Sequence, residues 1–366
     1  MSRGLFAFAL IVGTLLAAPY SGRKPVEAQA LDRPTAVLLP AGTIAFEART
    51  DSNSPSVWEL VQGRPTLFLF SSAGWPIRQV GAQLSTLDEL GPVEFTTRPP
   101  HGVWMEAIVP DVDGTWYGYY HNELPAEVCD AAEHRTIPRI GAARSFDFGA
   151  TWEDLGVILQ APVGWHQCDS PNRYFVGGVG DFSVILDQEA KDLYFFISQY
   201  GNREHTQGVA VGRMAWANRD RPAGRMSLWW HGTWVPARRI RSSESTTYAY
   251  PVGVPIFRAV DGWHDDEQVD AFWGPSVHWN THLEQYVMLL NHAQDTEWRQ
   301  EGIYMSFTKA LNDPASWSAP RRLLPGGRWY PQVMGAQVGI GTDTIAGERA
   351  RFFMSGSSSF VIQFVR

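Results

Sequence analysis

Two acidic residues of this 366-residue sequence stand in short apolar or glycine-rich stretches. Glu106 lies in Val-Trp-Met-Glu-Ala at 103–107, and Asp181 lies in Gly-Val-Gly-Asp-Phe-Ser at 178–183. Apolar neighbours raise the pKa of a carboxyl group and favour its protonated form, whereas glycines allow a ligand to approach closely. Cleavage of a glycosidic bond needs one protonated and one ionised carboxyl group. We therefore predict Glu106 as the acid and Asp181 as the base. The alternative is that both are buried partners of arginines or backbone groups.

Further polar and aromatic residues stand at the ends of predicted strands. His121 and Glu123 are two residues apart, so they face the same side of a strand. Glu123 can replace Glu106 as the acid, or both residues belong to a solvated loop edge. Aromatic faces fit the C–H-rich faces of sugar rings. The predicted substrate contacts are Asn53, Trp104, His121, Trp273, His278, Trp329 and Tyr330. The alternative is packing between sheets for the aromatic residues and a hydrogen-bonded core position for His278.

The elements that must position these residues form a fivefold repeat. Each copy starts with a short stretch of the form small-Pro-small-Val or a near variant, at 54–57, 105–108, 181–184, 274–277 and 330–333. An alternating aromatic or aliphatic strand follows each start, and most copies add a third and a fourth strand. Five units of about four antiparallel strands predict an all-β fold, a five-bladed β-propeller over residues 31–366. A β-sandwich is the alternative. The last copy lacks an outer strand, and we expect residues 41–48 to supply it and close the ring.

Residues 145–152 read Ser-Phe-Asp-Phe-Gly-Ala-Thr-Trp. This segment matches S-x-D-x-G-x-T-W, the Asp box of sialidase-like and related propellers. Asp147 can accept backbone N–H bonds in the turn, Gly149 allows a positive φ, and Trp152 can pack on the blade. We expect a structural rather than a catalytic role for Asp147.

The blade starts resemble those of a known group of enzymes when they are taken with Gly-Ile-Tyr-Met-Ser at 302–306 and Trp-Ser-Ala-Pro at 317–320. The sequence looks like the five-bladed-propeller glycoside hydrolases of the arabinanase, xylosidase and fructosidase type. The resemblance implies a base Asp, a second Asp that adjusts a pKa and an acid Glu on the first strands of successive blades. Glu106 and Asp181 stand at the matching starts of the second and third blades. The first blade has Ser54-Pro55 in place of Asp-Pro, and no Glu-Gly-Pro follows.

Residues 1–30 have the features of a secretory signal peptide. Arg3 precedes an apolar run over 5–18, and Ala-Gln-Ala at 28–30 offers a cleavage site. The apolar run falls short of the ~20 residues that span a bilayer. Export makes a disulfide between Cys129 and Cys168 reasonable, and no other cysteine is present. We predict a secreted or periplasmic protein with no membrane partner after cleavage.

Charge and missing motifs exclude several classes of function. Removal of residues 1–30 leaves 27 basic and 37 acidic residues, a net charge of −10, with no basic cluster for nucleic acid. The sequence has no Gly-x-Ser-x-Gly elbow and no H-E-x-x-H zinc motif. We expect a monomer that needs no cofactor and has no metal-ligand set, although an axial Ca²⁺ ion is left open. The predicted function is glycoside hydrolysis of an oligo- or polysaccharide. The alternatives are lectin-like carbohydrate binding without turnover and a protein-interaction scaffold.

Overall fold

Runs of aromatic and β-branched residues between glycine-rich turns form the strands of this protein. The computed structural model describes residues 34–366 except 128, 130–134, 163, 242–245 and 266. The part from Pro34 to Arg366 is one compact unit. The predicted signal peptide lies outside the described residues. Among the described segments, none is a helix of the length and apolarity needed to cross a bilayer.

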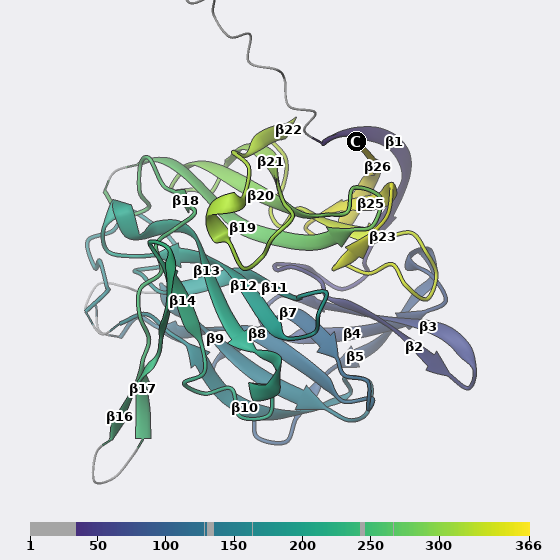
Figure 1. Cartoon of the computed structure of the whole chain (residues 1–366), viewed down its shortest axis with the longest axis horizontal. Coiled ribbons are helices and arrows are strands. Elements are labelled where there is room, and N and C mark those ends of the chain that lie inside the picture. The colour runs from purple at the N-terminus through teal and green to yellow at the C-terminus, as the bar shows by residue number, and fades with distance from the viewer. Residues whose placement is uncertain (1–33, 128, 130–134, 163, 242–245, 266) are drawn as a thin grey trace, which may run out of the picture. The chain divides into compact units, whose positions relative to one another are not determined.

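Five antiparallel sheets account for most of the strands, and each contains four principal strands (Figure 1). Blade 1 consists of β2 (Ser56–Val61), β3 (Arg64–Ser72), β4 (Pro76–Gly81) and β5 (Leu87–Pro92). Blade 2 consists of β7 (Gly102–Pro110), β8 (Trp116–Pro125), β9 (Thr136–Ser145) and β10 (Thr151–Leu159). Blade 3 consists of β11 (Val179–Leu186), β12 (Asp192–Tyr200), β13 (Gln207–Ala215) and β14 (Ser227–Trp230). Blade 4 consists of β19 (Gln268–Asn280), β20 (Gln285–Asp295), β21 (Gln300–Thr308) and β22 (Arg321–Pro325). Blade 5 consists of β23 (Gln332–Gly335), β25 (Arg349–Met354), β26 (Ser357–Val365) and β1 (Thr35–Ala45).

Short strands extend or join these blades. They are β6 (Glu94–Phe95), β15 (Thr233–Pro236), β18 (Phe257–Arg258) and β24 (Ile345–Ala346). A separate hairpin of β16 (Arg238–Arg241) and β17 (Thr246–Ala249) projects at the lower left of Figure 1. Single turns of 3₁₀ helix lie at Leu84–Thr86, Glu204–Thr206, Trp216–Asn218 and Pro314–Ser316.

The core lies between the blades. Separate clusters of buried apolar side chains fill the spaces between neighbouring sheets. Tyr119 of blade 2 meets Phe195 of blade 3 with ring centroids 5.1 Å apart, and Phe196 of blade 3 meets Trp317 near blade 4 at 5.3 Å. Because β8, β12 and β20 are covered on both faces, their successive residues are buried without alternation. The innermost strands β7, β11 and β19 also contact one another in sequence. The predicted five-bladed β-propeller is confirmed.

The N-terminal strand closes the ring, as expected, but its bounds differ from the prediction. β1 spans Thr35–Ala45 instead of 41–48, and it pairs antiparallel with β26 from Thr35 opposite Val365 to Ala45 opposite Ser357. The strand includes Pro40, which lies opposite Phe360, and its register shifts between Pro40 and Ile44. Proline is tolerated in an edge strand, where its missing N–H faces no partner.

The turn between β9 and β10 is tied by side chains. The Asp147 carboxylate accepts from the Thr151 backbone N–H at 2.9 Å and from Ser145 Oγ at 2.8 Å. Gly149 has φ +76°, and a Cβ there would meet the Phe70 ring at 2.5 Å. Trp152 is fully buried and donates its Nε1 to Gly149 O at 3.0 Å. The turn therefore anchors blade 2 on blade 1.

A second set of bonds joins blade 5 to blade 1. Asp343 Oδ1 accepts from the Ser56 backbone N at 2.8 Å and from Ser56 Oγ at 2.9 Å. The Asp343 backbone N donates to Ser56 Oγ at 3.0 Å, and Trp58 Nε1 donates to Gly341 O at 2.7 Å. Burial raises the pKa of Asp343 to about 6. The carboxylate is thus the main acceptor for the first residue of β2.

Replacement of Asp343 by alanine is expected to lower the free energy of unfolding by about 1–3 kcal/mol, because the Ser56 N–H is left buried without an acceptor. Urea unfolding of the purified variants measures this loss. Ser56→Ala is the control, since it keeps the backbone bond to Asp343 and is expected to lose less. An Asp343→Ala protein as stable as the parent would show that the Asp343–Ser56 hydrogen bonds do not stabilise the contact between blades 5 and 1.

Candidate functional site

Glu106 and Asp181 both stand at β-bulges of innermost strands. The pairing of β7 with β8 shifts register between Met105 and Ala107, and that of β11 with β12 shifts between Gly180 and Phe182. A bulge removes its extra residue from the regular alternation and redirects the side chain. Asp181 also has φ +42°, an uncommon conformation for a residue other than glycine. The two bulges take these carboxyl groups out of the packing between blades.

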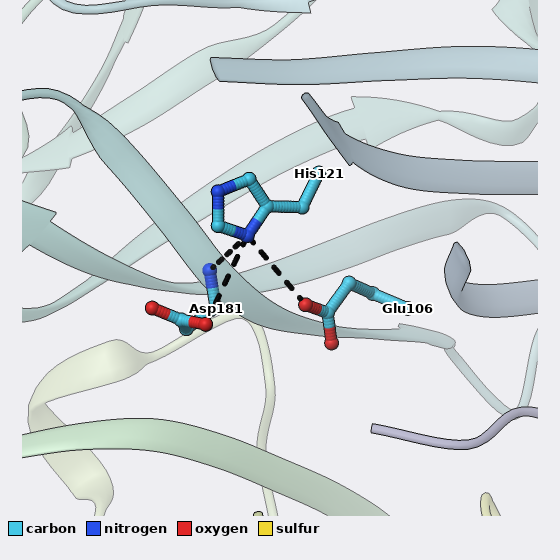
Figure 2. Close-up of side chains that lie close together, drawn as sticks. All are labelled: Glu106, His121 and Asp181. Atoms are coloured by element: carbon cyan, nitrogen blue, oxygen red, sulfur yellow. Dashed lines mark hydrogen bonds and ion pairs between the residues drawn. The ribbon is translucent and has the colours of Figure 1, made fainter. Parts of the chain in front are cut away.

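His121 from β8 lies between the two carboxyl groups. Its Nδ1 is 3.8 Å from Glu106 Oε1 and 3.8 Å from Asp181 Oδ1 (Figure 2). Its Nε2 is 3.6 Å from Glu123 Oε1. Each of Glu106, His121 and Asp181 is only 2% exposed. The structure therefore brings together the predicted acid, base, substitute acid and orienting histidine.

The His121 ring is arranged as a neutral imidazole. The Asp181 backbone N–H donates to Nδ1 at 3.4 Å, so Nδ1 is the acceptor nitrogen and the ring proton belongs on Nε2. Burial lowers the pKa of His121, although the charge of Glu123 opposes this shift. The Nε2 proton then faces Glu123 Oε1 at 3.6 Å, and Nε2 has no hydrogen-bond partner among the described residues.

Asp181 is built to hold a negative charge. Tyr330 donates its hydroxyl to Oδ1 at 3.0 Å, and the hydroxyl of Tyr200 donates to Oδ2. Burial raises the pKa of Asp181 and the two tyrosine hydroxyls oppose this rise, so that the pKa is about 6. Because donors to both oxygens favour the ionised form, Asp181 is a carboxylate at neutral pH. This is the protonation state that a base requires.

Glu106 has the opposite environment. Its Oε2 accepts one bond, from the Asn53 backbone N at 3.0 Å, and its Oε1 has no hydrogen-bond partner among the described residues. Burial raises the pKa of Glu106 well above its ordinary value, and the charge of Asp181 raises it further. A buried carboxyl group beside a carboxylate keeps its proton. Glu106 is therefore the protonated member of the pair.

Asp51 is an acidic neighbour that the sequence analysis did not select. It lies just before blade 1 and donates its backbone N to Ser72 O at 2.7 Å. Burial raises the pKa of Asp51, and so does the charge of Asp181. Its own charge raises the pKa of both Glu106 and Glu123. The sequence did contain a sign of this residue. The resemblance implied an Asp-Pro at the start of the first blade, and Asp51 stands three residues before the Ser54-Pro55 found there.

Two of the predicted substrate contacts border the cluster. The Asn53 side-chain amide donates to Phe182 O at 2.9 Å and to Pro275 O at 3.1 Å, so it joins blades 3 and 4 beside Glu106. Trp104 is half-buried, and its ring centroid is 5.6 Å from that of His121. Tyr200 was not predicted, and it enters the cluster because β12 ends beside the start of β11, where the Tyr200 backbone N–H donates to Gly178 O at 3.0 Å.

The other aromatic candidates form a neighbouring group. Trp273 is 1% exposed and packs against Trp298 at 4.6 Å and Tyr330 at 5.6 Å. Trp329 is half-buried and donates its Nε1 to Trp298 O at 2.8 Å. Trp273 thus supports Tyr330 from within the protein, whereas Trp329 keeps part of its ring in contact with solvent. Trp298 was not predicted, since it comes from the connection between β20 and β21.

His278 lies apart from these contacts. It is fully buried in β19, and its ring centroid is 5.5 Å from that of Phe364 in blade 5. Neither ring nitrogen has a hydrogen-bond partner within the described part of the chain. Burial lowers the pKa of His278 to about 3, so the ring is neutral. No hydrogen bond, ion pair or ring contact among the described residues joins it to Glu106 or Asp181.

The central cluster also has the donor types of a cation site. One atom each of Glu106, His121 and Asp181 lie within 4.8 Å of one another. However, Asp181 already accepts two tyrosine hydroxyls, and His121 Nδ1 already accepts the Asp181 N–H. A cation at His121 Nδ1 would have to displace the Asp181 N–H bond, because this nitrogen has a single lone pair. The described hydrogen bonds therefore leave His121 Nδ1 unavailable as a metal ligand.

Comparison with known proteins gives matches of fold. No protein-family model and no curated protein sequence matches the chain. An endo-arabinase from Bacteroides thetaiotaomicron aligns over 87% of this chain and 97% of its own, with 12% identity and a TM-score of 0.46. An α-L-arabinanase from Cellvibrio cellulosa aligns over 86% and 91%, with 14% identity and a TM-score of 0.48. An exo-β-1,3-galactanase from Phanerochaete chrysosporium aligns over 90% and 63%, with 12% identity and a TM-score of 0.47.

Proposed function

We propose that this protein is a secreted or periplasmic glycoside hydrolase that acts on an oligo- or polysaccharide. The observation that carries the proposal is a pair of buried carboxyl groups in opposite protonation states, set on facing bulges and bridged by a neutral histidine. Two carboxyl groups in these states are the minimum for acid–base cleavage of a glycosidic bond. The Cys129–Cys168 disulfide, with Cα atoms 5.3 Å apart, supports an oxidising compartment.

Each carboxyl group has one role in this proposal. Glu106 gives its proton to the glycosidic oxygen as the bond to the sugar breaks. Asp181 supplies the negative charge, either to activate a water or to stabilise the positive charge on the sugar ring. Tyr200 and Tyr330 hold Asp181 ionised and fix its orientation. His121 contacts both groups through Nδ1, and its Nε2 faces Glu123.

In this proposal the substrate enters the cluster at Glu123 and Asp51, which are less buried than Glu106 and Asp181. The Glu123 side chain is 23% exposed, and its Oε2 accepts from Thr136 Oγ1 at 3.1 Å. Asp51 is also only partly buried. Glu123 is therefore the second candidate for the acid, because it is nearer to solvent and burial also raises its pKa.

Carbohydrate binding without turnover is the second candidate function. The burial of both Glu106 and Asp181 to 2% exposure favours it, since a sugar must displace neighbouring side chains to touch them. In that case Trp104 and Trp329 would bind the sugar, and the carboxyl groups would hold the blades in place.

The test is a screen of the mature protein against aryl glycosides and plant or algal oligosaccharides, with Glu106→Gln and Glu123→Gln run beside it. We expect turnover of at least one substrate and a loss of about 10²–10⁴-fold in Glu106→Gln. A loss confined to Glu123→Gln would move the acid role to Glu123. Oligosaccharide binding with no turnover would overturn the enzyme proposal in favour of the second candidate.

A further inference from the structure

A groove of about 570 Å³ lies beside the aromatic group of blades 4 and 5. Its residues come from the β20–β21 connection, the β22–β23 connection and the β25–β26 turn. They are Gln294, Glu297, Trp298, Arg299, Gln300, Gly327, Arg328, Trp329 and Ser355. In blade 2 the corresponding edge, where the second strand ends, carries Glu123. The groove and the carboxyl cluster therefore open at the same edge of their blades.

The segment that lines the groove also reaches the cluster. Arg328 and Trp329 are followed directly by Tyr330, whose hydroxyl donates to Asp181. Asn291 holds this segment at both ends, because its Nδ2 donates to Arg328 O at 3.1 Å and its Oδ1 accepts from Tyr330 N at 2.9 Å. Two residues span at most about 7 Å of chain, so the groove begins close to the reacting centre.

The groove has one cation without a partner. Arg173 pairs with Glu297, and Arg299 Nε pairs with Asp295 Oδ2 at 2.6 Å. The exposed Arg328 guanidinium has neither an ion pair nor a hydrogen bond among the described residues. An unpaired guanidinium binds a carboxylate through two parallel bonds, which neutral hydroxyls match less well.

Aromatic surface stands next to this cation. The exposed face of Trp329 neighbours Tyr174, which is 43% exposed and lies 6.0 Å away between ring centroids. Trp298 forms the floor beneath both rings, 6.3 Å from Trp329 and 5.8 Å from Tyr174. A sugar ring stacks on such a surface, with its polar substituents directed to groups at the rim.

We infer that this groove binds a uronic acid unit of the substrate chain, with its ring on Trp329 and its carboxylate on Arg328. The inference rests on the proposed function and names its substrate class: a chain with a neutral sugar at the cleaved bond and an acidic sugar at a distance from it. The unit at the reacting centre must be neutral because the Asp181 carboxylate repels a further carboxylate, Asp51 and Glu123 are acidic neighbours of it, and the neutral His121 and protonated Glu106 offer no positive charge.

The test measures binding by calorimetry in a Glu106→Gln background, so that it does not depend on turnover. The probes are a glucuronate-bearing xylo-oligosaccharide and a glucuronate-bearing galacto-oligosaccharide, each beside its carboxyl-reduced form. We expect at least one acidic probe to bind about tenfold more tightly than its reduced form, with an affinity that falls as salt is added. Arg328→Gln is expected to remove this preference and to leave the affinity for the reduced form unchanged.

Arg64→Gln is the matched control, because Arg64 is exposed on β3 and lines no part of the groove. It is expected to keep the preference for the acidic probe. Equal binding of acidic and reduced forms by the parent, or a preference that survives Arg328→Gln, would overturn the inference. If the glycoside screen shows turnover, either of these binding results would leave the proposed hydrolase intact. If the screen shows no turnover but Arg328→Gln removes the preference for the acidic probe, the hydrolase would be overturned and the uronate site would stand.

Discussion

Asp181→Asn is expected to lower kcat at pH 7 by about 10²–10⁴-fold on any substrate that the parent hydrolyses, because the carboxylate that we propose as the base is replaced by a neutral amide. In the parent, kcat should rise with pH through about 6 as Asp181 loses its proton. It should fall again at higher pH as Glu106, whose pKa is raised well above its ordinary value, loses its own. The measurement is the pH–rate profile of both proteins.

The pH–rate profile of Tyr330→Phe tests whether Asp181 is the base or an acidic residue with a structural role. Its hydroxyl lowers the pKa of Asp181, so its removal raises that pKa and moves the acid limb of the profile to higher pH. Tyr117→Phe is the control, since Tyr117 donates its hydroxyl to Asp220 at 2.8 Å and touches no member of the cluster. An acid limb that stays in place in Tyr330→Phe would show that another group, such as Asp51, is the base.

Removal of the disulfide is expected to lower the free energy of unfolding by about 2–4 kcal/mol, because Cys129 and Cys168 close a loop of 39 residues. The double variant Cys129→Ser/Cys168→Ser should therefore unfold at lower urea concentration than the parent. The parent under reducing conditions is the control and should match the variant. Equal midpoints for the oxidised parent and the variant would contradict this prediction.

The same double variant is expected to be less active than the parent, because the disulfide supports the segment that holds Glu123. The bridge joins the β8–β9 and β10–β11 connections, and Arg135 adds bonds to Ser170 O at 2.7 Å and Cys168 O at 2.8 Å. Thr136, the next residue, donates to Glu123. Loosening these connections frees the Glu123 carboxyl group at the entrance to the cluster.

The fold was predictable from sequence because every blade must bury two apolar faces, and this requirement repeats in phase along the chain. Glu106 and Asp181 were identified by their place at blade starts, and the structure brings them together with His121 and Glu123. The register shifts that aim these side chains leave no mark in local sequence, since a bulge depends on the pairing with the next strand.

The residues that were missed depend on contacts between distant segments. Tyr200 and Asp181 are 19 residues apart and meet only through the pairing of β11 with β12. Asp51 belongs to no strand, so the repeat did not include it. Trp273 was predicted to face a sugar, but Trp298 from another connection covers it. Periodicity shows which face of a strand is apolar, and it does not show which loop covers the strand end.

The pairing of β1 with β26 joins residues that are far apart in the chain. Thr35 and Val365 are partners although 330 positions separate them. Until the last strand arrives, β1 is an unpaired edge that can join strands of other chains. Tyr330, which donates to Asp181, lies just before the first strand of the same blade. The pairing that closes the ring and the contact that completes the cluster therefore both depend on the folding of blade 5, and loss of its other strands would expose β1 to aggregation and leave Asp181 without the Tyr330 hydroxyl.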